Sequence, residues 1–203
     1  MNHIDIPETM TGVVLTGHGG LDKLEFRENL NVPKAGVGEV LIKVGASAIN
    51  NTDINTRTGW YSKGVTTGTD QGAASGFETA SEEDGTWSGK PLSFPRIQGA
   101  DVCGTIVAVG EAVDRGRIGE RVLVRPMQQS PDNPSSYNLI TFGSECNGGY
   151  AEYAVARSSE VFAVNSTLSD TELASFPCAY STAEGMLDRA DLKAGERILI
   201  TGA

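Results

Sequence analysis

Residues 94–125 read FPRIQGADVCGTIVAVGEAVDRGRIGERVLVR, and this stretch decides the fold class. Two runs rich in β-branched residues, Val102–Val109 and Arg121–Val124, are separated by a charged turn. Such runs, bounded by Gly and Pro, are typical of buried strands. Gly104 lies inside the first run, and glycine within a strand marks a bend or a close approach of another backbone. We therefore predict that this stretch forms a corner of a small closed sheet.

Composition limits the classes of function. The chain has 203 residues, a net charge of −10 and 3 cysteines. The negative charge argues against nucleic acid or an anionic membrane as partner, because both favour clustered Lys and Arg. No apolar run approaches the ~20 residues that span a bilayer. The N-terminus lacks a signal-peptide pattern, and widely spaced cysteines indicate free thiols. We therefore expect a cytoplasmic protein with no nucleic-acid or membrane partner.

The flanking residues extend the β pattern toward the N-terminus. Predicted strands cover Thr11–Thr16, Leu24–Asn29 and Val40–Ala46. The Asn- and Thr-rich segment Ser47–Tyr61 predicts a short helix capped by side-chain oxygens. Residues 62–94 form a long polar segment with Phe77 and Trp87 as its large side chains.

The second half adds the remaining predicted elements. Residues 126–147 predict a polar loop, and Gly148–Ala156 a strand. Ser169 and Glu172 form a capping box that begins a helix, which Pro177 should end. The last predicted elements are a second helix at Ser181–Ala190 and a strand at Arg197–Thr201.

These motifs resemble the medium-chain dehydrogenase/reductase superfamily, the zinc-type alcohol dehydrogenase-like proteins, whose catalytic domain is similar to the chaperonin GroES. The barrel pattern of that superfamily is matched by Pro95, Gly99, Asp101, Gly104, Ile106, Val109, Gly110 and Val113, and then by Gly119, Glu120, Arg121 and Val122. The run PKAGVGEVLIKV at 33–44 and the G-x-A-E-Y motif at 149–153 also match.

The resemblance implies a mainly β fold with short helices, a GroES-like partly open β-barrel leading into the first strand of a truncated Rossmann domain. The GroES-like domain would cover residues 1–165, with an insertion at 62–94. Residues 166–203 would hold connecting helices and that first Rossmann strand. The insertion is expected either to act as a mobile cover over the substrate or to be a disordered surface loop.

Zinc-dependent relatives hold their catalytic metal with a Cys, a His-Glu pair and a second Cys. The matching positions here are Asn50, then Ala100 with Asp101, and Cys178, so only the last keeps its ligand. Cys146 alone stands where relatives carry a four-cysteine structural zinc lobe. The sequence therefore predicts no zinc, and it follows the N-x-x-D pattern of the quinone-oxidoreductase-like, zinc-free branch.

In that branch the resemblance implies the roles of several residues. Asn50 would be a neutral donor near the nicotinamide or the substrate oxygen, and Thr52 would relay protons. Asp53 would orient the Asn50 turn rather than carry out acid–base chemistry. Tyr61 would donate to a substrate carbonyl, or be only a half-buried aromatic side chain.

Two further residues are implied to contact the cofactor. Thr182 would contact the nicotinamide, or be a plain N-cap hydroxyl. Gly202 would begin the dinucleotide-binding loop, which the 203 residues do not include. We therefore expect this chain alone to bind NADPH weakly and to catalyse nothing. Cys103, inside the central strand, is expected to be a small core residue.

The implied activity is NADPH-dependent hydride transfer, with NADH possible, to a quinone, enone or other carbonyl substrate without zinc. The complete protein would be a homodimer. The alternatives are a non-enzymatic binding or structural member of the same fold, and a zinc-type alcohol dehydrogenase with altered ligands. The joint presence of Asn50, Asp53, Tyr61 and Thr182 favours the enzyme.

Overall fold

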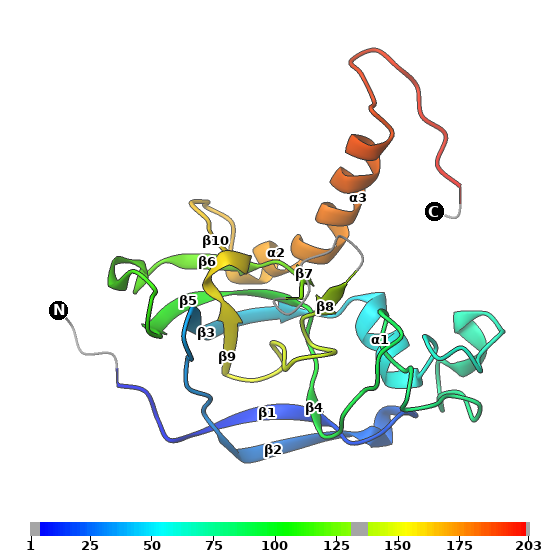
Figure 1. Ribbon diagram of the computed structural model, residues 1–203, viewed down its shortest axis with the longest axis horizontal. Helices are drawn as coiled ribbons and strands as arrows, with labels where there is room; N and C mark the ends of the chain where they lie inside the picture. The colour runs from blue at the N-terminus through cyan, green and yellow to red at the C-terminus, as the bar shows by residue number, and fades with distance from the viewer. Residues whose placement is uncertain (1–4, 131–137, 202–203) are drawn as a thin grey trace.

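The computed structural model describes residues 5–130 and 138–201 (Figure 1). The strands are β1 (Thr9–Leu15), β2 (Leu24–Asn31), β3 (Glu39–Ala48), β4 (Arg96–Ile97), β5 (Asp101–Val109), β6 (Arg121–Val124), β7 (Met127–Gln129), β8 (Leu139–Thr141), β9 (Tyr153–Arg157) and β10 (Val161–Ala163). The α-helices are α1 (Asn51–Thr58), α2 (Asp170–Ala174) and α3 (Pro177–Arg189). Short 3₁₀ helices of about one turn are also present. The prediction of a mainly β chain with short helices is confirmed. In the described part, no helix has both the length and the apolar character needed to cross a membrane.

Strand β5 lies at the centre of a 5-stranded sheet with the order β10-β6-β5-β3-β9. It pairs antiparallel with β6, so that Cys103 lies opposite Leu123, and antiparallel with β3 on its other side. The predicted strand pair within residues 94–125 is therefore confirmed. The register between β3 and β5 shifts beside Gly104, where an added Cβ would lie 2.4 Å from the carbonyl oxygen of Lys43. Glycine is required there because the two backbones approach so closely.

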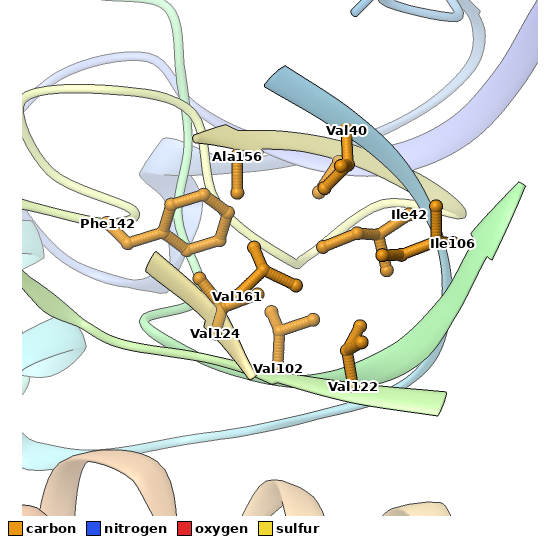
Figure 2. Close-up of a cluster of buried hydrophobic side chains, with 10 residues drawn as sticks. Val40, Ile42, Val102, Ile106, Val122, Val124, Phe142, Ala156 and Val161 are labelled. Atoms are coloured by element: carbon orange, nitrogen blue, oxygen red, sulfur yellow. The ribbon is translucent and has the colours of Figure 1, made fainter. Parts of the chain in front are cut away.

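The main hydrophobic core lies between the strands of this sheet. Figure 2 shows the side chains converging from β3, β5, β6 and β10. The cluster contains Val40, Ile42, Val102, Ile106, Val122, Val124, Phe142, Ala154, Ala156 and Val161. Each fully buried Val or Ile stabilises the fold by about 1.5–3 kcal/mol relative to an exposed one. This packing fixes the start of β5, which supports the candidate site described below.

A second, 3-stranded sheet with the order β2-β1-β4 closes the other side of the barrel. An isolated bridge from Gly12 to Ala151 connects it to the residues that precede β9. Met10, Val14 and Ile97 of this sheet pack with residues of the larger sheet in a second apolar cluster. In Figure 1, β1 and β2 lie beneath the larger sheet, which completes a partly open barrel.

The barrel continues into two helices. Leu173 and Ala174 of α2 pack against Cys103, which is completely buried, so the prediction of a core role for this cysteine is confirmed. Figure 1 shows α3 projecting away from the barrel. Much of α3 is accordingly exposed, including Tyr180 and Met186.

Several predicted boundaries are wrong. The second helix begins at Pro177 rather than Ser181, because proline is well tolerated in the first turn, where its missing N–H is not needed. Residues 126–147 contain the hairpin β7–β8 and not only a loop, although Pro131 and Pro134 lie outside the described residues.

Two predicted strands also differ from the structure. The strand expected from Gly148 begins only at Tyr153, and Gly148–Gly149 instead pass close to the backbone of residues 97–99. Arg197–Thr201 forms no strand, and the side chain of Leu199 is 87% exposed. A β-strand needs a neighbour for its backbone groups, and no neighbour pairs with this segment in the described part of the chain.

Residues 62–94 contain one 3₁₀ turn, Thr69–Gly72, and are otherwise irregular. Phe77 packs against Gly72, where an added Cβ would lie 2.1 Å from its ring. Trp87, the other large side chain of the segment, is 51% exposed. The idea of a mobile cover stays a prediction.

Candidate functional site

The first part of the candidate site is the N-terminus of α1. Asn50 is the N-cap, and its Oδ1 accepts a hydrogen bond from the Thr52 amide at 3.1 Å. In return, Asp53 Oδ2 accepts from the Asn50 amide at 2.9 Å. This reciprocal arrangement is a capping box, which explains why an Asn-Asn-Thr-Asp sequence begins a helix here. Because Oδ1 of Asn50 is used by the helix, its Nδ2 group is the one that can donate to a ligand.

Asp53 connects this helix to the barrel. Its Oδ1 accepts from the amides of Gly99 at 3.1 Å and Ala100 at 3.2 Å, and its side chain is 5% exposed. Burial raises the pKa of Asp53 above its ordinary value, while hydrogen bonds from the Asn50 and Gly99 amides and from Tyr150 oppose the rise. The carboxylate therefore holds the Asn50 turn against the residues just before β5.

Tyr61 and Thr52 form a pair of hydroxyl groups beside this turn. The Tyr61 hydroxyl donates to Thr52 Oγ1 at 3.1 Å, and both side chains are half-buried. Helix α1 ends at Gly59, whose left-handed backbone (φ 79°) turns the chain so that Tyr61 returns alongside the helix. The structure thus brings Asn50, Thr52, Asp53 and Tyr61 together.

Thr182 belongs to a second group of contacts, on α3. Its hydroxyl donates to the carbonyl oxygen of Cys178 at 2.7 Å, and its side chain is exposed. Thr182 therefore lies within the helix, and the alternative of an N-cap hydroxyl is wrong because the helix begins earlier. Gly202 lies outside the described residues.

Asp101 is a residue of the site region that was not among the site residues predicted from the sequence. Its Oδ1 accepts from the amide of Cys178 at 2.5 Å, in the first turn of α3. The N-cap residue Phe176 makes no side-chain cap, so Asp101 supplies this hydrogen bond from the barrel instead. The sequence showed Asp101 only at a former metal-ligand position, and no local spacing links it to a helix 77 residues away.

Residues 36–166 match the family model of the alcohol dehydrogenase GroES-like domain. The chain belongs to this family. The GroES-like fold class predicted from the sequence is therefore confirmed for the barrel.

Relatives of this GroES-like domain include named oxidoreductases. The chain is 28% identical to the chloroplastic NADPH-dependent alkenal/one oxidoreductase of Arabidopsis thaliana, over 96% of this chain and 41% of that protein. It is 29% identical to the human quinone oxidoreductase, over 96% of this chain and 46% of that protein. A candidate alcohol dehydrogenase from Sinorhizobium meliloti has a similar structure, with a TM-score of 0.79 and 45% identity over 97% of this chain and 51% of that one. The chain thus spans about half the length of these relatives.

The residues at the positions that match the zinc ligands of relatives do not fit a catalytic zinc. Asn50 Oδ1 is engaged by the Thr52 amide, and Ala100 offers only a buried methyl group. Cys178 keeps a sulfur ligand, but burial and the charges of Asp101 and Asp53 raise the pKa of its thiol to about 11. A tetrahedral zinc site needs about three such protein ligands.

The charge state of Asp101 leads to a prediction about stability. Burial, with a contribution from the charge of Asp53, raises its pKa from 3.8 to about 6, against the opposing effect of the Cys178 amide. Since the folded-state pKa is raised, the stability contributed by this group is present below pH ~4 and is lost as the pH rises through ~6. We therefore expect Asp101→Asn to raise the free energy of unfolding by about 1–3 kcal/mol at pH 8, and by much less at pH 4.

Thermal and urea denaturation at the two pH values measure this difference. The exposed Asp22, replaced by Asn, is the matched control and should change stability little at either pH. An Asp101→Asn variant that is less stable than the natural chain at pH 8 would show that the hydrogen bond to Cys178 needs a full negative charge.

Proposed function

We propose that this chain is the catalytic-domain portion of an NADPH-dependent oxidoreductase that reduces a quinone, enone or other carbonyl substrate without catalytic zinc. The proposal rests on the N-terminus of α1, where the N-cap residue Asn50 lies next to the Thr52–Tyr61 hydroxyl pair. These are neutral hydrogen-bond donors, the groups that stabilise a developing oxyanion when no metal is present. The names of the relatives, an alkenal/one oxidoreductase and a quinone oxidoreductase, support the same reaction class.

The roles of the residues follow from the direction of their hydrogen bonds. Asn50 Nδ2 donates to the substrate oxygen, on which negative charge develops as a hydride adds to the conjugated carbon. Because Tyr61 donates to Thr52 Oγ1, the proton of the Thr52 hydroxyl is free to pass to the product, and Tyr61 replaces it. Tyr61 thus acts behind Thr52 rather than directly on the substrate. Asp53 holds the turn and transfers no proton.

The cofactor assignment is part of the proposal. A reduced nicotinamide supplies the hydride when it is bound, and NADPH is favoured by the name of the plant relative. NADH is the other candidate, because an alcohol dehydrogenase relative from Sulfolobus acidocaldarius is NAD-dependent. Asn50 and the exposed Thr182 are proposed to contact the nicotinamide. Gly202 and residues beyond Ala203 are proposed to begin the site for the cofactor phosphates.

The similarity to these oxidoreductases also supports a proposal for the domains, location and oligomeric state of the complete protein. Residues 166–203 would connect the barrel to a nucleotide-binding domain, and the complete protein would act as a cytoplasmic homodimer on small molecules. An assay of NADPH oxidation, using a chain extended beyond Ala203, tests the function. Reduction of an α,β-unsaturated ketone or a quinone supports it. Oxidation of simple alcohols with no enone or quinone reduction would contradict it.

Metal content gives an independent prediction. Elemental analysis of the purified protein should find far less than one zinc per chain, because Asn50 and Ala100 replace two ligands. Replacing Cys178 by Ser should leave turnover nearly unchanged for the same reason. About one tightly bound zinc per chain, lost together with activity in Cys178→Ser, would favour a zinc-type alcohol dehydrogenase with altered ligands.

A further inference from the structure

Asp84, from the middle of residues 62–94, binds the residues that directly follow Tyr61. Its Oδ1 accepts from the Ser62 hydroxyl at 2.7 Å, and its Oδ2 accepts from the Lys63 amide at 3.1 Å. Ser62 Oγ in turn accepts from the Ser81 amide at 3.0 Å. We call these contacts among Ser62, Lys63, Ser81 and Asp84 the Asp84 clamp.

The Asp84 clamp combines a buried hydroxyl group, that of Ser62, with the charged carboxylate of Asp84. Ser62 is 2% exposed, and the carboxylate uses both of its oxygens. The Ser62 hydroxyl and the Lys63 amide lower the pKa of Asp84, so it is ionised at neutral pH. Charge-assisted hydrogen bonds of this kind are stronger than neutral ones.

Other contacts hold the same segment to α1 and to the hairpin β7–β8. The Phe77 amide donates to the carbonyl oxygen of Thr58 at 3.0 Å, at the end of α1. The buried Arg57 donates to the carbonyl oxygens of Gly19 at 2.5 Å and Ala73 at 3.1 Å. Lys90 donates to Asn138 Oδ1 at 2.9 Å, beside β8. These contacts hold residues 62–94 next to α1. The segment is therefore placed so that it can position a side chain beside this helix.

Tyr61 is the side chain that the Asp84 clamp controls. It is adjacent in sequence to Ser62, in the turn where the Ser62 amide donates to the carbonyl oxygen of Gly59 at 3.1 Å. The backbone is thus held on both sides of Tyr61, by Gly59 before it and by Asp84 after it. A hydroxyl that must stay 3.1 Å from Thr52 Oγ1 depends on such a fixed backbone.

We propose that Asp84 is a positioning residue that acts through Tyr61, so that residues 62–94 form part of the active site. This inference rests on the proposed function, in which Tyr61 supplies protons to Thr52. It assigns to the segment a defined task in catalysis, and it predicts that the two acceptor oxygens of Asp84, unlike the carboxylates of its acidic neighbours, are needed for full turnover.

The test is a kinetic cycle in a chain extended beyond Ala203, with NADPH and an enone as substrates. Asp84→Ala should lower kcat roughly ten- to a hundredfold with little change in KM, because misplacing a catalytic group by about 1 Å has effects of this size. Ser62→Ala removes the clamp from its other end and should lower kcat in the same direction. Asp84→Asn, which keeps one acceptor oxygen, should retain part of the activity. The neighbouring Glu83, replaced by Ala, removes an equal charge and should leave kcat unchanged.

The Tyr61→Phe background separates positioning from a merely structural role. If Asp84 acts through Tyr61, adding Asp84→Ala to Tyr61→Phe should change kcat less than twofold, since effects on one unit are not additive. Equal losses in both backgrounds overturn the inference, and so does normal kcat in Asp84→Ala. Hydrogen exchange at the Lys63 and Ser81 amides, measured on the same variants, verifies that the clamp has opened. If the extended chain without any substitution reduces neither an enone nor a quinone, the proposed function is overturned instead, and the Asn50 variants test that function separately.

Discussion

Replacing Asn50 by alanine should lower kcat/KM for NADPH-driven reduction by roughly ten- to a thousandfold, the usual cost of removing a positioned oxyanion donor. In the proposed mechanism this residue has two separable tasks. Its Oδ1 caps α1 through the Thr52 amide, which leaves Nδ2 to donate to the substrate oxygen. Alanine removes both groups and should also cost about 1 kcal/mol of stability through the lost cap.

Aspartate at position 50 distinguishes the two tasks. Asn50→Asp keeps an oxygen for the Thr52 amide but has no Nδ2 group, so its melting temperature should stay near that of the natural chain. Its kcat/KM should nevertheless fall as far as that of the alanine variant. If steady-state kinetics of Asn50→Asp match those of the natural protein, Asn50 has no part in catalysis.

Replacing Asp53 by alanine should reduce the free energy of unfolding by on the order of 3–5 kcal/mol, the largest stability effect that we expect in this site. The carboxylate accepts hydrogen bonds from the buried backbone amides of Gly99 and Ala100 and from the half-buried amide of Asn50. Alanine would leave all three without that partner, and a buried unsatisfied donor costs about 1–3 kcal/mol. Urea denaturation followed by circular dichroism measures the change.

Asp114 provides a matched control for Asp53. It also accepts from a backbone amide, that of Gly116 at 2.8 Å, but it does so on the exposed surface. Asp114→Ala should therefore cost no more than about 1 kcal/mol. If Asp53→Ala costs as little as Asp114→Ala, the amides near β5 have other partners and Asp53 does not hold the α1 turn.

The parts of the fold that the sequence predicted well are those set by local patterns. The β-branched runs in β5 and β6, the helix capped by side-chain oxygens at α1 and the capping box of α2 depend on residues a few positions apart, and all were confirmed. The predicted strand at Arg197–Thr201 was wrong, because an apolar run becomes a strand only when a neighbour pairs with it.

The candidate site was predictable only in part. Asn50, Thr52 and Asp53 lie within one helical turn, so their association followed from the sequence. The links from Asp101 to Cys178 and from Asp84 to Ser62 were not predictable, because they join residues that only the folded barrel brings together. Composition suggested either a mobile cover or a disordered surface loop for residues 62–94, since composition does not record which polar groups find partners.

The residues at the start of β5 have a consequence for how the site loses order. Gly99 and Ala100 donate to Asp53 at the beginning of α1, and the next residue, Asp101, accepts from the first turn of α3. Two helices that are far apart in the sequence therefore share three consecutive residues as their foundation. We expect the starts of α1 and α3 to lose order together, since both lose these hydrogen bonds if that short segment separates from the sheet. The proposed substrate side and the proposed cofactor side of the site would thus melt together, rather than one after the other.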